Sequence, residues 1–144
     1  MIYFDTSALV KLYYPEDESK SVSHWVLNRE EAIPFTLFHE LELNTALSAR
    51  VFRGDVTLQE RENARKAIES DLLTGVLIKT SVDWERAFAE ALELCDRHSI
   101  QLGCRSLDIM HVACAMILGC SGVVSYDRRQ RSLAAAAGLQ AISV

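Results

Sequence analysis

Short runs of β-forming residues alternate with helical segments along the chain, and this alternation constrains the fold more than any other feature. Bulky and β-branched residues predict strands near 2–4, 32–34, 76–78, 123–124 and 141–144. The two-residue turns that join antiparallel hairpins are missing between them, so we expect parallel pairing. The predicted fold class is α/β, a three-layer sandwich with a central parallel sheet.

Capping residues predict where several of the intervening helices begin and end. Thr36 is a plausible N-cap for a long helix that stops near Gly54, and the spacing of Thr57 and Glu60 fits a capping box. Gly138 is expected to end the last helix. The other predicted helices include residues 8–12, 22–26, 84–95 and 106–118. In the third of these, Trp84, Phe88, Leu92 and Cys95 mark one face.

Length and charge limit what the chain can do. The 144 residues fit one domain spanning 1–144. Fifteen basic and twenty acidic residues give a formal net charge of −5, which argues against binding nucleic acid by broad neutralisation of phosphates. Contact with a polyanion must then be local or bridged by cations. Neither a signal-peptide pattern nor an apolar run of about 18 residues is present, so we expect a soluble, cytoplasmic protein with no membrane partner.

The cysteines and one histidine are expected to be structural. Cys95, Cys104, Cys114 and Cys120 form no CxxC pair and lie in or beside apolar segments, so we expect buried free thiols. His111 lies in a helix filled with core residues, which favours a packed, hydrogen-bonded histidine over a catalytic one.

Carboxylates follow two of the predicted strands, and a third begins a buried helix. Asp5 and Asp127 come directly after strand ends, where open α/β sheets bind ligands, and Asp108 lies in the first turn of the helix in 106–118. We expect the three to face one crevice. Each also has a structural alternative: Asp5 or its neighbours and Asp127 can cap helices, and Asp108 can stabilise a helix dipole while paired with Arg105.

A fourth carboxylate belongs to the helix that follows Thr36. Glu40 and Glu42 both project from this helix, which is apolar around much of its circumference. A helical wheel places Glu42 between Phe38 and Ala46 and Glu40 between Leu47 and Val51, so either side chain could be half-buried. The pattern alone leaves both candidates open.

Four stretches together resemble the PIN-domain nucleases, especially the VapC toxins of bacterial toxin–antitoxin pairs. They are YFDTSALVKLY, ELNTAL, SLDIMHVACA and VVSYDRRQRSLAAAAGL. In the family the glutamate is usually followed four and five residues later by Ala and Leu, which selects Glu42. The resemblance implies an acidic pocket of Asp5, Glu42, Asp108 and Asp127, with Thr6 and Ser125 as hydroxyl neighbours. It also implies a homodimer and an antitoxin whose basic segment lies across the groove.

Such a pocket needs cations. Two carboxylates 4 Å apart repel by about 4 kcal/mol at an effective dielectric constant near 20, so hard divalent ions or protons must offset the repulsion. An all-oxygen donor set favours Mg²⁺, with Mn²⁺ as a substitute. Two such ions could hold an RNA phosphodiester and activate a water, so we expect a Mg²⁺-dependent endoribonuclease, the toxin of a toxin–antitoxin pair.

Arginines near the acids are candidate RNA contacts, and two other functions compete with RNA cleavage. Arg105, Arg128 and Arg129 could grip phosphates, although ordinary surface charge explains each of them equally well. An acidic module that binds a basic peptide or RNA without catalysis is the first rival. A haloacid dehalogenase-type phosphohydrolase is the second, but it requires an aspartate at the position of Ser7.

Overall fold

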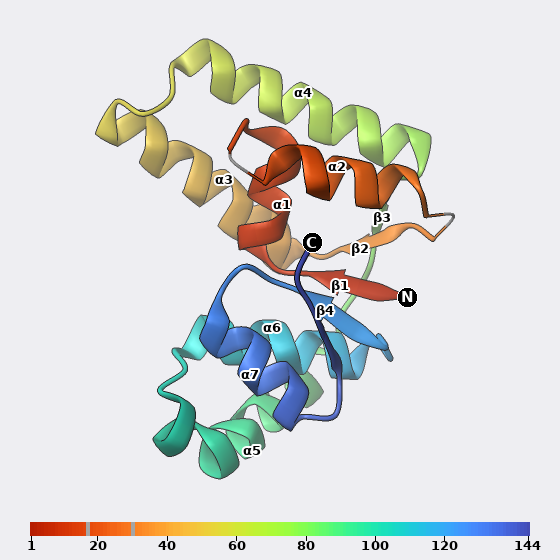
Figure 1. Ribbon diagram of the computed structural model, residues 1–144, viewed down its shortest axis with the longest axis vertical. Coiled ribbons are helices and arrows are strands. Elements are labelled where there is room, and N and C mark those ends of the chain that lie inside the picture. The colour runs from red at the N-terminus through yellow and green to blue at the C-terminus, as the bar shows by residue number, and fades with distance from the viewer. Residues whose placement is uncertain (17, 30) are drawn as a thin grey trace. The chain divides into compact units, whose positions relative to one another are not determined.

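The computed structural model describes residues 1–16, 18–29 and 31–144, which fall into two compact units (Figure 1). The first unit contains Met1–Asp5 and Ser81–Ser143, and the second contains Thr6–Thr80 with Val144. The expectation of a single domain stays a prediction. The elements are β1 (Ile2–Phe4), α1 (Thr6–Tyr13), α2 (Ser19–Leu27), β2 (Ile33–Phe35), α3 (Leu37–Arg53), α4 (Leu58–Thr74), β3 (Leu77–Lys79), α5 (Trp84–Leu102), α6 (Ser106–Ile117), β4 (Gly122–Val124), α7 (Arg128–Ala136) and β5 (Gln140–Ile142).

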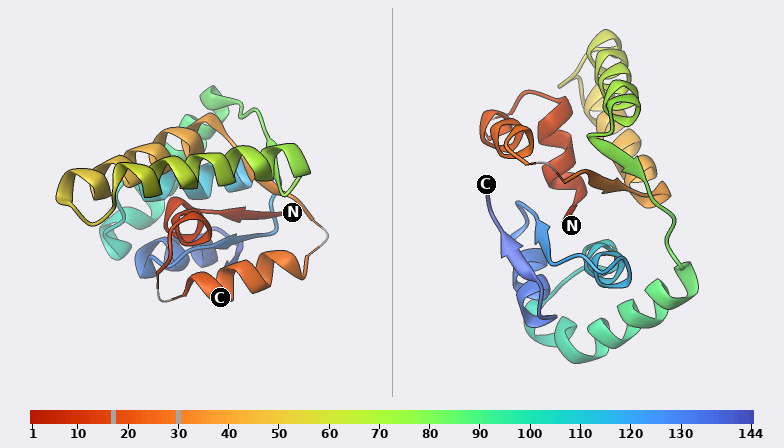
Figure 2. Two further views of the ribbon diagram at one scale, coloured as in Figure 1. Left: turned by 90° about the horizontal axis from the view of Figure 1, so that it is seen from above. Right: turned by 90° about the vertical axis from the view of Figure 1, so that its right-hand side faces the viewer.

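The first unit is built on a parallel sheet with the strand order β1-β4-β5. Tyr3 pairs with Val123, which in turn pairs with Ala141, so β4 is the central strand. Helices α6 and α7 pack against β4, α7 also contacts β5, and α5 packs on α6 and α7 (Figure 2). The predicted parallel pairing is confirmed. Because the strands run in the same direction, the residues that follow β1 and β4 emerge at the same edge.

Helix α6 is the most buried helix of the first unit. Every residue from Ile109 to Ala115 is buried, as the apolar composition of this segment predicts. His111 lies among them, and its Nδ1 is 3.0 Å from the hydroxyl oxygen of Tyr3 on β1. The prediction of a packed, hydrogen-bonded histidine is therefore confirmed. This burial fixes α6 and with it the position of its first turn, which carries Asp108.

The second unit combines helices α1 to α4 with a two-stranded parallel sheet of β2 and β3. Helix α1 contacts α2, α3 and α4, while α4 also packs against β3. The predicted capping box is confirmed, because Thr57 accepts from the backbone of Glu60 and the Glu60 side chain accepts from the backbone of Thr57. Helix α3 begins after Thr36 and ends at Gly54, as predicted. Both long helices of this unit are thus defined by their caps.

The face of α5 that Trp84, Phe88, Leu92 and Cys95 mark is largely exposed. Phe88 and Leu92 are 58% and 67% exposed, whereas Ala87 and Leu94 are buried. The helix continues to Leu102. Apolar side chains of this helix occupy more than one face, so the spacing alone did not identify the side that packs on α6 and α7.

The predicted burial of the cysteines holds for only part of the set. Cys114 and Cys120 are buried free thiols, whereas Cys95 is exposed and Cys104 is half-buried. The position of Cys95 follows from the packing of α5, and Cys104 lies in the segment between α5 and α6.

No helix in the described part of the chain is long and apolar enough to cross a membrane.

Gly122 is required where β4 approaches β5. A Cβ at this position would lie 2.8 Å from the backbone oxygen of Gln140, which is closer than van der Waals contact allows. We expect Gly122→Ala to lower the free energy of unfolding by about 1–3 kcal/mol, because a backbone atom must move. Denaturant unfolding measures this loss. Gln140→Ala at the paired, exposed position should change stability by less than about 0.5 kcal/mol, and equal losses in the two variants would contradict the prediction.

Candidate acidic active site

Asp5 is a buried carboxylate at the end of β1. Its backbone N–H donates to the carbonyl of Val124 at 3.0 Å, so the parallel ladder continues one residue beyond the strand. The residue is only 2% exposed, and the Ser125 hydroxyl donates to its Oδ2 at 2.6 Å. Ser125 directly follows β4, the strand paired with β1. The parallel pairing therefore brings together two side chains that are 120 positions apart in the chain.

Asp127 caps α7 and is linked to the same serine. Its Oδ1 accepts from the backbone N–H groups of Arg129 at 2.7 Å and Gln130 at 3.0 Å, so its predicted capping role is confirmed. Its own backbone N–H donates to Ser125 Oγ at 3.0 Å. Among the described residues, none forms a hydrogen bond or an ion pair with its second oxygen. One oxygen of Asp127 thus stabilises the helix, and the other is available to a ligand.

Asp108 lies in the first turn of α6 and contacts Arg105, as the structural alternative predicts. Its Oδ2 accepts from the Arg105 backbone N–H at 3.1 Å and lies 3.4 Å from Arg105 Nε. The Asp108 side chain is 13% exposed, whereas that of Arg105 is 76% exposed. An ion pair with so exposed a partner is screened by solvent and contributes little to stability. The Arg105 side chain can therefore leave Asp108 at small cost.

The half-buried Cys104 thiol is influenced by the charges of both Asp108 and Asp127. Burial raises the pKa of Cys104, and the negative charges of Asp108 and Asp127 raise it further, while Arg129 lowers it. Two carboxylates on different helices are thus within electrostatic reach of one sulfur atom. In the described residues, however, no three His, Cys, Asp or Glu side chains form a group that could hold a metal ion.

In the second unit, the two candidate glutamates of α3 have different partners. The Thr6 hydroxyl at the start of α1 donates to Glu42 Oε2 at 2.6 Å. The Glu40 carboxylate instead lies 4.0 Å from Lys79 Nζ at the end of β3. Thr6 directly follows Asp5 in the chain, so Glu42, unlike Glu40, contacts a residue that is adjacent in sequence to a predicted acid. The helical wheel could not make this distinction because it contains no information about α1.

The candidate RNA-binding arginines also differ in what they contact. Arg129 Nη1 donates to the carbonyl of Gly103 at 3.1 Å, and Arg105 contacts Asp108. Arg128 is exposed, and within the described residues its guanidinium has no hydrogen bond or ion pair. The contact of Arg129 was not anticipated from the sequence. No local pattern indicates it, because it depends on how α7 packs beside the segment between α5 and α6.

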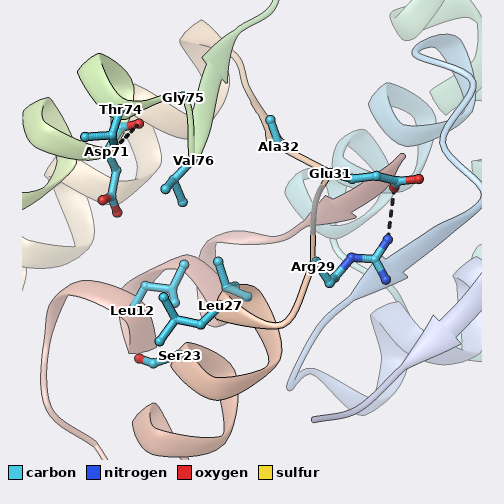
Figure 3. A pocket seen from close by; sticks show the side chains of 11 residues that line it. Leu12, Ser23, Leu27, Arg29, Glu31, Ala32, Asp71, Thr74, Gly75 and Val76 are labelled. Atoms are coloured by element: carbon cyan, nitrogen blue, oxygen red, sulfur yellow. Dashed lines mark hydrogen bonds and ion pairs between the residues drawn. The ribbon is translucent and has the colours of Figure 1, made fainter.

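A separate pocket of about 390 Å³ lies in the second unit, among α1, α2, α4 and the segment before β2 (Figure 3). Arg29 and Glu31 form an ion pair of 2.9 Å at its rim, and the Arg29 guanidinium lies over the Trp25 ring. Asp71, another lining residue, accepts from the Tyr13 hydroxyl at 2.8 Å. Neither Thr6 nor Glu42 lines this pocket, so it is distinct from the candidate acidic site.

Comparison with known proteins identifies the family. The PIN domain model matches residues 2–136, and the chain therefore belongs to the PIN domain family. The PIN fold confirms the predicted fold class, a three-layer α/β sandwich with a parallel sheet. None of the curated proteins matches the chain.

Two solved structures are similar over nearly the whole chain. The first is Mycobacterium tuberculosis VapC20, described as a sarcin-ricin loop cleaving toxin, with 17% identity and a TM-score of 0.71 over 99% of this chain and 98% of that one. The second is FitAcB from Neisseria gonorrhoeae, with 16% identity and a TM-score of 0.67 over 94% of each chain. At these identities the likeness concerns the fold.

Proposed function

We propose that this PIN domain is a divalent-metal-dependent endoribonuclease and the toxin of a toxin–antitoxin pair. The observation that carries the proposal is the position of Ser125. Its hydroxyl donates to Asp5 and accepts from the backbone of Asp127, so it links two of the predicted acids at the ends of adjacent parallel strands. Membership of the PIN family and the likeness to an RNA-cleaving toxin support the same function.

The proposed metal ligands are Asp5, Glu42, Asp108 and Asp127. Their donors are all carboxylate oxygens, which suit Mg²⁺ and, as a substitute, Mn²⁺. The open oxygen of Asp127 and the solvent-screened pair of Asp108 fit this role, because both carboxylates can accept a ligand without breaking a strong contact. A bound divalent ion would lower the pKa of a water and stabilise the leaving oxygen of the phosphodiester.

The hydroxyl groups beside the acids orient them. The Ser125 hydroxyl donates to one oxygen of Asp5, and the Thr6 hydroxyl donates to one oxygen of Glu42. Hydrogen bonds of this kind restrict the rotation of a metal ligand and strengthen binding. With a metal-activated water as the nucleophile, the reaction would need no nucleophilic side chain.

RNA is the proposed substrate, held by few positive charges. Arg128 is the exposed guanidinium closest in sequence to Asp127, and Arg105 and Arg129 are further candidates. With a net charge of −5, binding should depend on local contacts, so the affinity should fall only weakly with salt. We also propose a cytoplasmic location, because the proposed substrate is RNA. An antitoxin with a basic segment and a homodimer are proposals that rest on the family resemblance.

RNA cleavage in the presence and absence of metal tests the proposal. We expect single-stranded or looped RNA to be cut with Mg²⁺ or Mn²⁺ and to stay intact when EDTA removes the ions. Addition of excess Mg²⁺ to the EDTA sample should restore cleavage, which excludes irreversible damage to the protein. Cleavage at the same rate with EDTA would contradict the metal-dependent mechanism.

One observation favours the rival function of an acidic binding module. Asp108 already pairs with a guanidinium, as it would with an arginine of a partner peptide. Thermal unfolding separates the two functions, because a ligand at 100 times its dissociation constant stabilises the native state by about 2.7 kcal/mol. For a nuclease, Mg²⁺ or Mn²⁺ raises the melting temperature. Stabilisation by an arginine-rich peptide but not by either metal would identify the binding module.

A further inference from the structure

Two contacts join the segment between α5 and α6 to the start of α7. Arg129 Nη1 donates to the carbonyl oxygen of Gly103 at 3.1 Å, and Cys104 Sγ lies 3.6 Å from the backbone oxygen of Arg129. Gly103 ends α5 with a φ of +63°, a conformation that favours glycine and that turns the chain toward α6. We call this pair of contacts the 103–129 clamp. The clamp joins Gly103 and Cys104, which are adjacent in the chain, to Arg129 of α7.

The clamp lies between two of the proposed metal ligands. On one side, Asp127 Oδ1 accepts from the backbone N–H of Arg129 at 2.7 Å. On the other side, the clamped segment ends at Arg105, whose backbone N–H donates to Asp108 Oδ2 at 3.1 Å. A continuous series of short contacts thus runs from Asp127 through Arg129 and Gly103 to the segment that holds Asp108.

We propose that Arg129 is a positioning residue that sets the spacing of Asp108 and Asp127 by holding the α5–α6 segment on the first turn of α7. The inference rests on the proposed function, because both acids belong to the proposed metal site. Metal ligands must be held within about 0.5 Å of their productive geometry, so a loose segment weakens metal binding. The planar guanidinium suits this task because it has several donors in a fixed arrangement.

Arg128 provides a matched control on the same helix turn. It has the same charge and is exposed, but in the described part of the chain its guanidinium forms no hydrogen bond or ion pair. Arg128→Ala therefore removes one positive charge without opening the clamp, whereas Arg129→Ala removes the same charge and opens it. Arg129→Lys keeps the charge but has only one donor nitrogen, so we expect it to hold the segment partly. This variant also provides the test if Arg129→Ala fails to fold.

Hydrogen–deuterium exchange tests the clamp without reference to activity. In Arg129→Ala we expect amide exchange in the peptide covering residues 103–109 to accelerate at least about 10-fold, since the segment opens locally more often. Exchange in Arg128→Ala should match the wild type, and Arg129→Lys should be intermediate. Equal exchange in the alanine variants and the wild type would overturn the proposal whatever their activities are.

Mn²⁺ binding and kinetics then test whether the clamp acts on the metal site. We expect Arg129→Ala to weaken Mn²⁺ binding about 10-fold and to lower kcat for RNA cleavage, as loss of an outer contact to a metal site does. Arg128→Ala should raise KM and keep the wild-type Mn²⁺ affinity. Wild-type Mn²⁺ affinity in Arg129→Ala would overturn the inference alone. A wild-type chain that neither binds Mn²⁺ nor cleaves RNA would overturn the proposed function as well.

Discussion

Asp5→Asn should abolish metal-dependent RNA cleavage while the chain stays folded. Asparagine has nearly the same volume as aspartate, and its carbonyl oxygen can still accept from the Ser125 hydroxyl. The substitution removes the negative charge of a carboxylate that is only 2% exposed, and a neutral amide is a poor ligand for Mg²⁺. Since loss of an outer contact alone costs 10–100-fold, we expect kcat/KM to fall by at least about 100-fold.

Thermal unfolding with and without metal separates loss of function from loss of structure. In EDTA, Asp5→Asn should melt no lower than the wild type, because a buried charge has been removed. With Mn²⁺, it should gain less stability than the wild type. Asp96→Asn on the exposed surface of α5 is the matched control and should behave as the wild type does. Metal-dependent cleavage at the wild-type rate by Asp5→Asn would refute the assignment of Asp5 as a ligand.

Glu42→Gln and Glu40→Gln should differ greatly in their effect on kcat/KM for RNA cleavage. The two substitutions are chemically identical and lie on one helix, so a difference in activity must come from the position of the glutamate. We expect Glu42→Gln to lower kcat/KM by at least about 100-fold, because the Thr6-oriented carboxylate is a proposed metal ligand. Glu40→Gln should retain activity within about 2-fold, since its partner Lys79 is exposed and such pairs contribute less than about 1 kcal/mol.

The readout is RNA cleavage at several Mg²⁺ concentrations, with circular dichroism to establish folding. If Glu42 is a ligand, high Mg²⁺ should recover part of the activity of Glu42→Gln, because weakened binding is offset by concentration. Equal losses in the two variants, or a greater loss in Glu40→Gln, would show that the contact between Thr6 and Glu42 does not mark the site.

The sequence predicts local features of this fold well, because they depend on neighbouring residues. The capping box of Thr57 and Glu60 and the N-cap of Asp127 were both predicted, since each involves residues within one turn. Parallel pairing followed from the absence of hairpin turns. The packing face of α5 was not predictable in the same way. The burial of Leu94 in place of Leu92 depends on contacts with α6 and α7, which the helical period does not specify.

The candidate site shows the same division between local and distant contacts. Sequence reasoning selected Asp5 and Asp127 from their places at strand ends, and the family resemblance added Ser125. The structure connects the three through hydrogen bonds. It could not choose Glu42 without the family resemblance, because the contact with Thr6 joins residues 36 positions apart. The clamp between Arg129 and Gly103 depends on the packing of α7 and was missed for the same reason.

The long separation between Asp5 and Ser125 has a consequence for synthesis of the protein. The first strand leaves the ribosome long before its partner β4, because Asp5 and Ser125 are 120 positions apart. Loop closure over such a distance cannot occur before the second strand exists. A nascent chain interrupted before residue 125 therefore lacks the hydroxyl that holds Asp5. If the protein is a nuclease, translation products that stop before β4 carry no complete site, and a cell is exposed to the activity only after this strand has been made.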